Sequence, residues 1–167
     1  FWVSLISKQT KMSKSIDPNK SLRSTKTSRG SVIDLLASGM SQVKTAEGSL
    51  YLGNWENGKM HGFGELTGTD IHYKGNYDQG LMHGQGVLTT PAGATEGTFV
   101  KNKIHGEGKF TAKDGSMYIG TFENGEKSGK GSLKFSSGDT YTGQFKSDLP
   151  HDENGKIVGK NGSHYSG

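Results

Sequence analysis

Aromatic and polar residues alternate along most of this chain, beginning near residue 50. Tyr51, Gly53 and Trp55 occupy every second position, and this period of two places them on one face of a β-strand. Asn57-Gly58 follows, and Asn-Gly between two such runs is a strong signal for a two-residue hairpin turn. A second run then carries His-Gly-x-Gly and an apolar residue two places further on. The pattern predicts a β-hairpin.

The hairpin pattern recurs along the chain. Copies begin at Tyr51, Tyr73, Thr95, Tyr118 and Tyr141, and a partial sixth begins at Tyr165. A single hairpin is marginal in water, whereas stacked copies share one continuous apolar stripe. The sequence therefore predicts an all-β array over residues 48–167, preceded by a different segment, 1–47.

Glycine supports the array. Of the 27 glycines, 25 lie after residue 47, and 21 of those 25 occupy fixed positions of the repeat. Paired glycines let an aromatic ring lie directly on the backbone, where a side chain would clash. The exceptions to the template are Thr95 for Tyr, Asn102 and Asp148 for the turn glycine, Ser128 for His, and Asp152 and Asn154 for two glycines of the fifth copy. The excess of glycine therefore indicates close packing and not a flexible linker.

Charge divides the chain at the same point. Residues 1–47 carry eight Lys or Arg and three Asp or Glu, a net charge of +5, whereas residues 48–167 carry twelve and thirteen, a net charge of −1. The basic residues of the arm are interleaved with Ser and Thr, which is typical of an irregular segment. The seven that precede the predicted helix, here called the basic arm residues, are Lys8, Lys11, Lys14, Lys20, Arg23, Lys26 and Arg29.

This basic arm suits contact with anionic lipid or with the acidic surface of tubulin, and a solvated linker is the alternative. Nucleic acid is not expected as a partner, because no recognised nucleic-acid-binding module accompanies the charge. The chain has no apolar run near the roughly 20 residues that span a bilayer, so no transmembrane segment is expected.

One short amphipathic helix is expected in the arm. Val32, Leu36, Met40 and Val43 follow one another at spacings of four, four and three, which places them on one helical face. A glycine at position 39 ends the helix early, so it is predicted over residues 32–38.

Histidine is the residue type whose pattern invites a metal site. His61, His83, His105 and His151 fill the same position in successive hairpins, roughly 9–10 Å apart for two strands per hairpin. Neighbours at this distance cannot share a metal ion, whose nitrogen ligands lie at about 2.0–2.1 Å. A structural role is therefore expected for these histidines, and no metal site.

The sequence also predicts no catalytic residues and no cofactor. The Ser, Asp and His residues show no nucleophile with a base and an orienting group around it. His-Gly-x-Gly lacks the following helix that a phosphate-binding glycine loop needs. The chain contains no cysteine, which excludes disulfides and thiolate metal sites and favours a reducing compartment.

The repeated pattern Tyr-x-Gly-x-aromatic followed by Gly-x-x-His-Gly-x-Gly resembles the MORN repeat (membrane occupation and recognition nexus). The resemblance covers residues 48–167, with five copies in register. It implies an extended, gently twisted single-layer antiparallel sheet of successive hairpins. It also implies a concave face lined by aromatic residues, which accepts a helix or an extended segment of a partner protein. Members of the family act as cytoskeletal, ciliary and radial-spoke scaffolds or as modules of larger proteins, and a phosphoinositide-binding role has been proposed for them.

These observations predict a non-catalytic scaffold protein that binds a partner through its aromatic face. The resemblance makes a ciliary axonemal, radial-spoke-like or other cytoskeletal assembly the expected setting, inside the cell. The alternatives are a membrane-tethering or phosphoinositide-binding protein and a regulatory module of a larger enzyme. The residues expected to bind the partner are Tyr51, Trp55, Tyr73, Tyr77, Phe99, Phe110, Tyr118, Phe122, Tyr141 and Phe145.

Overall fold

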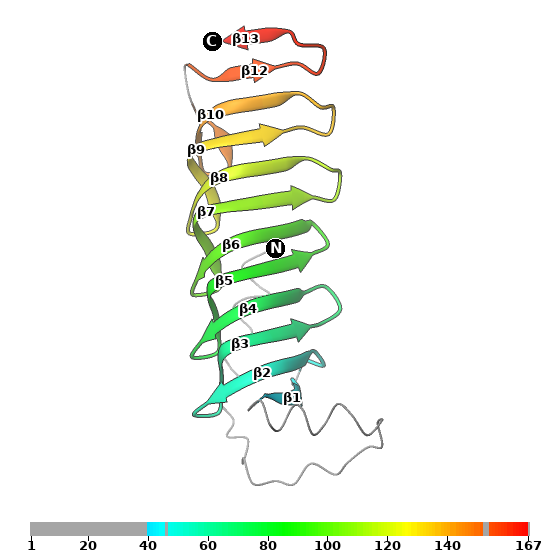
Figure 1. Ribbon diagram of the computed structural model, residues 1–167, viewed down its shortest axis with the longest axis vertical. Helices are drawn as coiled ribbons and strands as arrows, with labels where there is room; N and C mark the ends of the chain where they lie inside the picture. The colour runs from blue at the N-terminus through cyan, green and yellow to red at the C-terminus, as the bar shows by residue number, and fades with distance from the viewer. Residues whose placement is uncertain (1–39, 46, 152–153, 167) are drawn as a thin grey trace.

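The computed structural model describes residues 40–45, 47–151 and 154–166. These residues form one antiparallel sheet whose strands follow one another in chain order, stacked along the long axis of the molecule (Figure 1). No second layer of described residues covers either face of the sheet (Figure 1). The predicted fold class, an extended single-layer sheet of tandem hairpins, is therefore confirmed.

Thirteen strands make up the sheet. They are β1 (Ser41–Lys44), β2 (Leu50–Glu56), β3 (Lys59–Thr67), β4 (His72–Asp78), β5 (Leu81–Thr90), β6 (Gly93–Val100), β7 (Lys103–Ala112), β8 (Met117–Glu123), β9 (Glu126–Lys134), β10 (Thr140–Lys146), β11 (Leu149–Pro150), β12 (Lys156–Val158) and β13 (His164–Ser166). The first four predicted copies are the hairpins β2–β3, β4–β5, β6–β7 and β8–β9, which we number first to fourth.

The fifth copy has a divided second strand. β10 pairs first with the two-residue β11 and then with β12. Pro150 has no backbone N–H to donate, which is one reason why β11 is short. Gly155 nevertheless fills the expected glycine position, because a Cβ there would come within 2.6 Å of the Tyr141 ring. The repeat template places Asn154 there, so the glycine lies one residue further along the chain than the template predicts.

β1 is a strand that the sequence analysis did not predict. Val43, which the spacing placed on a helical face, lies instead in β1 opposite Tyr51 of β2. A turn closed by a hydrogen bond of 3.0 Å, from the Gly48 N–H to the Thr45 carbonyl, brings the two strands together. Pairing with β2 thus decides the conformation of residues 41–44. The helix predicted over 32–38 and the seven basic arm residues lie outside the described residues.

The five turns inside the repeats, at residues 57–58, 79–80, 101–102, 124–125 and 147–148, have positive φ at both central residues, as type I′ hairpins require. Two of them use Asn102 and Asp148 where the template has glycine. The side-chain Oδ1 of Asn102 accepts a hydrogen bond of 2.7 Å from the N–H of Met82, in the preceding hairpin. Asp148 accepts one of 2.9 Å from the N–H of Lys127. These departures from the template therefore add a bond between successive hairpins.

Candidate interaction surfaces

Strand registers place three rows of residues across one side of the sheet, which we call the aromatic face. The tyrosine row alternates Tyr with an apolar residue, as in Tyr51 opposite Leu66 and Leu66 opposite Tyr73. The glycine row consists of Gly53, Gly64, Gly75, Gly86, Gly97, Gly108, Gly120, Gly131 and Gly143. A second aromatic row pairs Trp55 with Met60 and Tyr77 with Met82, and continues in the later hairpins.

Each tyrosine of the tyrosine row lies over the glycine pair of its own hairpin. Around Tyr118, a Cβ on Gly120 would come within 2.6 Å of the Tyr118 Oη, and one on Gly131 within 2.5 Å of the Tyr118 ring. The hydroxyl then donates to the backbone carbonyl of Thr121, at 2.9 Å. Tyr51, Tyr73 and Tyr141 repeat this bond three residues along, at 3.0, 3.1 and 3.3 Å. Glycine is therefore required because the ring takes the space of its side chain.

The rings contact one another edge to face in two separate runs. The first run joins Trp55, Tyr51, Tyr77, Tyr73 and Phe99, with centroid distances of 5.1 to 5.3 Å. The second joins Phe122, Tyr118, Phe145 and Tyr141, at 4.8 to 5.3 Å. T-shaped pairs of this geometry each add about 0.5–1.5 kcal/mol to area burial. Aromatic contacts between hairpins therefore stabilise the array on both sides of its third copy.

The third hairpin interrupts the aromatic runs. Thr95 replaces the tyrosine, and the side chain of Ile104 from β7 covers the glycine pair in its place. A Cβ on Gly97 would lie 3.2 Å from Ile104 Cδ1, and one on Gly108 would lie 2.6 Å from it. Ile104 is accordingly buried. An aliphatic side chain can therefore do the covering that tyrosine does elsewhere.

Most of the residues predicted to bind a partner are core residues. Eight of the ten rings are buried: Tyr51, Tyr73, Tyr77, Phe99, Tyr118, Phe122, Tyr141 and Phe145. Trp55 and Phe110 are half-buried. These eight rings therefore pack between hairpins, where neighbouring side chains cover most of their surface. Their part in partner binding stays a prediction.

Burial also changes the acidity of four tyrosines of the aromatic face. It raises the pKa of Tyr51, Tyr73 and Tyr118 to about 12 in each case. Burial raises the pKa of Tyr77 still further. Among the described residues, the Tyr77 hydroxyl has no hydrogen-bond partner. The neutral phenol is therefore the form that this fold requires.

The four template histidines have different environments. His61 is half-buried, with Nε2 3.4 Å from Glu56 and Nδ1 3.5 Å from Asp78. His83, His105 and His151 are exposed, so burial does not account for their recurrence. Among the described residues, no group of three His, Asp or Glu side chains converges as metal ligands would.

The side of the sheet away from the rings, which we call the opposite face, has a different character. Phe63, Val87 and Ile119 project from it with exposed fractions of 46%, 40% and 49%. Glu65 and Lys74 lie between them on neighbouring strands, with Lys74 Nζ 3.5 Å from Glu65 Oε2. The sequence pattern predicts partner binding on the aromatic face alone. The signal for this second surface is the residue beside each template glycine, which points the other way.

One small hydrogen-bonded cluster orders the opposite face near its N-terminal end. His72 Nε2 lies 2.7 Å from Glu65 Oε1. This hydrogen bond, with a smaller contribution from Lys74, holds the pKa of Glu65 below its usual value. The carboxylate is therefore ionised and oriented between two basic side chains.

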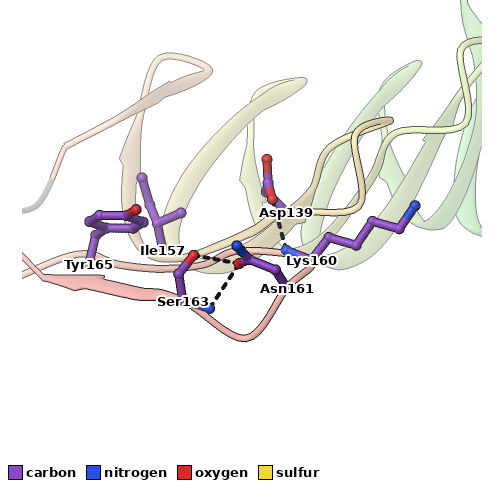
Figure 2. Close-up of a pocket in the computed structure, with 7 residues that line it drawn as sticks. Asp139, Ile157, Lys160, Asn161, Ser163 and Tyr165 are labelled. Carbon is purple, nitrogen blue, oxygen red and sulfur yellow. Dashed lines mark hydrogen bonds between the residues drawn. The ribbon is translucent and has the colours of Figure 1, made fainter.

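A surface depression near the C-terminal end offers no binding chemistry of its own. Figure 2 shows Asp139, Ile157, Lys160 and Tyr165 around it. The Asp139 carboxylate already accepts a bond of 2.9 Å from the Lys160 N–H. Neighbouring polar atoms likewise close the turn before β13, so the depression is a structural feature of that turn (Figure 2).

Comparison with known families agrees with this geometry. The family model for the MORN repeat matches residues 51–70, 73–95, 96–117, 118–140 and 141–151. The five matched segments correspond to the five predicted copies. No curated protein matches the chain. Within the described residues, no helix has the length and apolar character needed to cross a bilayer.

Proposed function

We propose, from the premise that this chain belongs to the MORN-repeat family, that it is a non-catalytic scaffold that binds a segment of a partner protein. The observation that carries the proposal is the single-layer sheet, whose two faces are not covered by other described residues (Figure 1). A stack of similar hairpins offers an extended surface of repeated sites, as in other repeat proteins. Binding along that surface needs no enclosed pocket.

The partner segment lies along the side chains of the aromatic face that are only half-buried. Trp55, Met60, Phe110 and Leu133 are half-buried there and pack against the buried rings. Tryptophan is favoured at the centres of protein interfaces, because a large rigid ring buries much surface at a low cost in entropy. The buried rings hold these half-buried side chains in position.

The proposed setting is a cytoskeletal assembly, in particular a ciliary axonemal structure resembling a radial spoke. The family resemblance and the basic arm support it, because a positive arm suits the acidic surface of tubulin. The proposed location is accordingly inside the cell, at the cytoskeleton.

Affinity capture with cross-linking from ciliated cells tests the scaffold function. Trp55→Ala should reduce recovery of the specific partner about tenfold or more, because it removes a large aromatic anchor. Leu149→Ala is the matched control, since Leu149 is 68% exposed and lies outside the aromatic face. Equal recovery with both variants, at equal folding by circular dichroism, contradicts the proposed surface.

Membrane binding is the second candidate function, and the net charge of +5 on residues 1–47 favours it. Electrostatic attraction to anionic lipid would place the binding in that arm, because the array itself has a net charge of −1. Flotation with phosphatidylcholine vesicles, with and without a phosphoinositide, separates the two functions. Replacing the seven basic arm residues by Ser should abolish any phosphoinositide-dependent flotation and leave the partner capture intact.

A further inference from the structure

The opposite face has a regular order of side chains across the sheet. From β2 to β8, a row that we call the charged row reads Leu52, Glu65, Lys74, Val87, Glu96, Lys109 and Ile119. An apolar, an acidic and a basic residue recur in that order every three strands. Val87 stands at the centre of the row, with three residues on either side.

We propose that this face binds a second copy of the same chain in an antiparallel, face-to-face dimer. Its two-fold axis runs along the strand direction and passes through Val87. Such an axis reverses the order of the strands and leaves each row facing the same row of the other copy. This inference stands independently of the proposed scaffold function.

The charged row is complementary to itself under this rotation. Val87 faces the Val87 of the other copy at the centre. Lys74 then faces Glu96, and Glu65 faces Lys109. At the ends, Leu52 faces Ile119. Each apolar side chain therefore meets an apolar one, and each acid meets a base, which is the arrangement that electrostatic complementarity favours.

A shift of one copy by one or two strands brings like charges together, and so does a parallel arrangement. Moving one copy along by a single strand sets Lys74 against Lys109, or Glu65 against Glu96. A parallel dimer, with its axis along the stack of strands, sets Glu65 against itself. Like charges opposite one another destabilise paired surfaces. A shift by three strands restores opposite charges, because the order repeats every three strands, but it matches only four strands in place of seven. The order of charges and the matched area together thus select the orientation and the register.

The neighbouring row on the opposite face fits the same axis. It runs through Leu50, Thr67, His72, Thr89, Ala94, Thr111 and Met117. Leu50 then faces Met117, and Thr89 faces itself. On the other side of the charged row no like charges meet, but Phe63 faces the Glu107 carboxylate, so the fit is weaker there. One strand further out Lys44 would face Lys134, so the match extends over seven strands.

The matched area is sufficient for a weak dimer. Seven strands at about 4.8 Å and a width of about five residues give roughly 570 Å² on each copy, or about 1,100 Å² in total. Stable interfaces exceed about 1,000 Å². Two sheets stack about 10 Å apart with strands nearly aligned, so facing side chains interdigitate. A dissociation constant in the micromolar range is expected.

A charge swap tests the interface in the full-length chain. Lys74→Glu should raise the dimer dissociation constant about tenfold in sedimentation equilibrium, because two symmetry-related attractions become repulsions. Lys74→Glu combined with Glu96→Lys should restore the wild-type value. Lys146→Glu, with the same charge change on the same face beyond the matched strands, should leave it unchanged.

The double variant separates this interface from effects inside one chain. It places like charges side by side within each copy, at positions 65 and 74 and again at 96 and 109. If Lys74 and Glu96 act only within one chain, the double variant should dimerise more weakly than both the wild type and Lys74→Glu. Recovery of dimerisation occurs only if Lys74 and Glu96 meet between copies.

Cross-linking tests the orientation, since the chain has no cysteine of its own. With a short bis-maleimide, Leu52→Cys mixed with Ile119→Cys should cross-link, because these positions face one another about 10 Å apart. Leu52→Cys alone should not, since its two copies lie six strands apart, roughly 29 Å.

Two results overturn the proposal. One is a wild-type chain that remains monomeric at about 1 mM, far above the expected range; the face would then be left to a different protein or to the N-terminal residues of the same chain. The other is a double variant that fails to regain the dimer while it remains folded.

Discussion

The second hairpin, β4–β5, and the third, β6–β7, cover the same backbone feature with different side chains. In the second, the Tyr73 ring lies over Gly75 and Gly86, donates to the Asn76 carbonyl at 3.1 Å and contacts the Phe99 ring. In the third, Ile104 reaches its glycine pair from the opposite strand. Both hairpins keep the array continuous, although only one of them carries a tyrosine.

The difference teaches that the glycine row needs an apolar cover, whereas tyrosine adds two further interactions. These are the hydroxyl bond to the backbone and the edge-to-face contact with the next hairpin. The third hairpin lacks both and compensates in part through Asn102, whose side chain bonds to the N–H of Met82. The effect of a substitution should therefore depend on the hairpin that carries it.

The largest contrast in stability is expected between Gly75→Ala in the second hairpin and Gly108→Ala in the third. A Cβ on Gly75 would come within 2.5 Å of the Gly86 Cα and 2.6 Å of the Gln85 carbonyl oxygen, so β4 and β5 would have to separate. Gly75→Ala should lower the free energy of unfolding by more than about 3 kcal/mol. Gly108→Ala should cost about 1–2 kcal/mol, because its closest contact is the flexible end of Ile104. Urea denaturation measures both, and equal losses contradict the comparison.

Alkaline pH should destabilise the hairpins that carry a buried tyrosine. Tyr51, Tyr73 and Tyr118 have their pKa raised to about 12 by burial, whereas in the unfolded chain tyrosine ionises near pH 10. Above about pH 10 the unfolded state therefore loses protons that the native state keeps, and the free energy of unfolding falls towards pH 12. Denaturation at a series of pH values measures the slope. Tyr118→Phe should make it shallower, and a flat profile contradicts the burial.

Transplanting a tyrosine should convert the third hairpin into one like the second. Thr95→Tyr alone is expected to lower the free energy of unfolding by about 1 kcal/mol, because Ile104 already fills the space. Adding Ile104→Met, the residue type found at the equivalent Met82, should recover this loss and add about 1 kcal/mol through the ring contact and the hydroxyl bond. Thermal and urea unfolding of the single and double variants measure both changes in the free energy of unfolding. A double variant less stable than Thr95→Tyr would show that the two hairpins differ in backbone geometry.

The smallest contrast concerns single hydroxyl groups. Tyr118→Phe removes the bond to the Thr121 carbonyl and should cost about 1 kcal/mol. Tyr77→Phe should change stability by less than about 0.5 kcal/mol or raise it slightly, since the Tyr77 hydroxyl is buried without a hydrogen-bond partner among the described residues. Phe99 occupies the equivalent place in the third hairpin. A larger loss at Tyr77 than at Tyr118 would contradict these hydrogen-bond assignments.

The sequence predicts the positions of the repeats correctly, but it does not predict which side chains are exposed. The copies and turns were predictable because alternation and turn residues are local signals. The burial of eight aromatic rings depends on contacts between hairpins, as when the Tyr51 ring meets the Tyr77 ring of the next copy. The covering of Gly108 by Ile104 was likewise beyond prediction, because nothing in the template ties that position to a glycine pair.

The sequence by itself determined that this protein is a linear array of hairpins, because each hairpin is specified by residues within one repeat of 22 to 24. Only the tertiary structure decided which face is core and which is surface, and that residues 41–44 pair as a strand. Every strand has two faces, and one of the two strands beside it belongs to another copy. The residues of a single repeat therefore do not decide which face is buried. Packing of rings on glycine backbone, visible only once the strands are in register, buries most rings of the aromatic face, whereas Phe63, Val87 and Ile119 on the opposite face stay exposed.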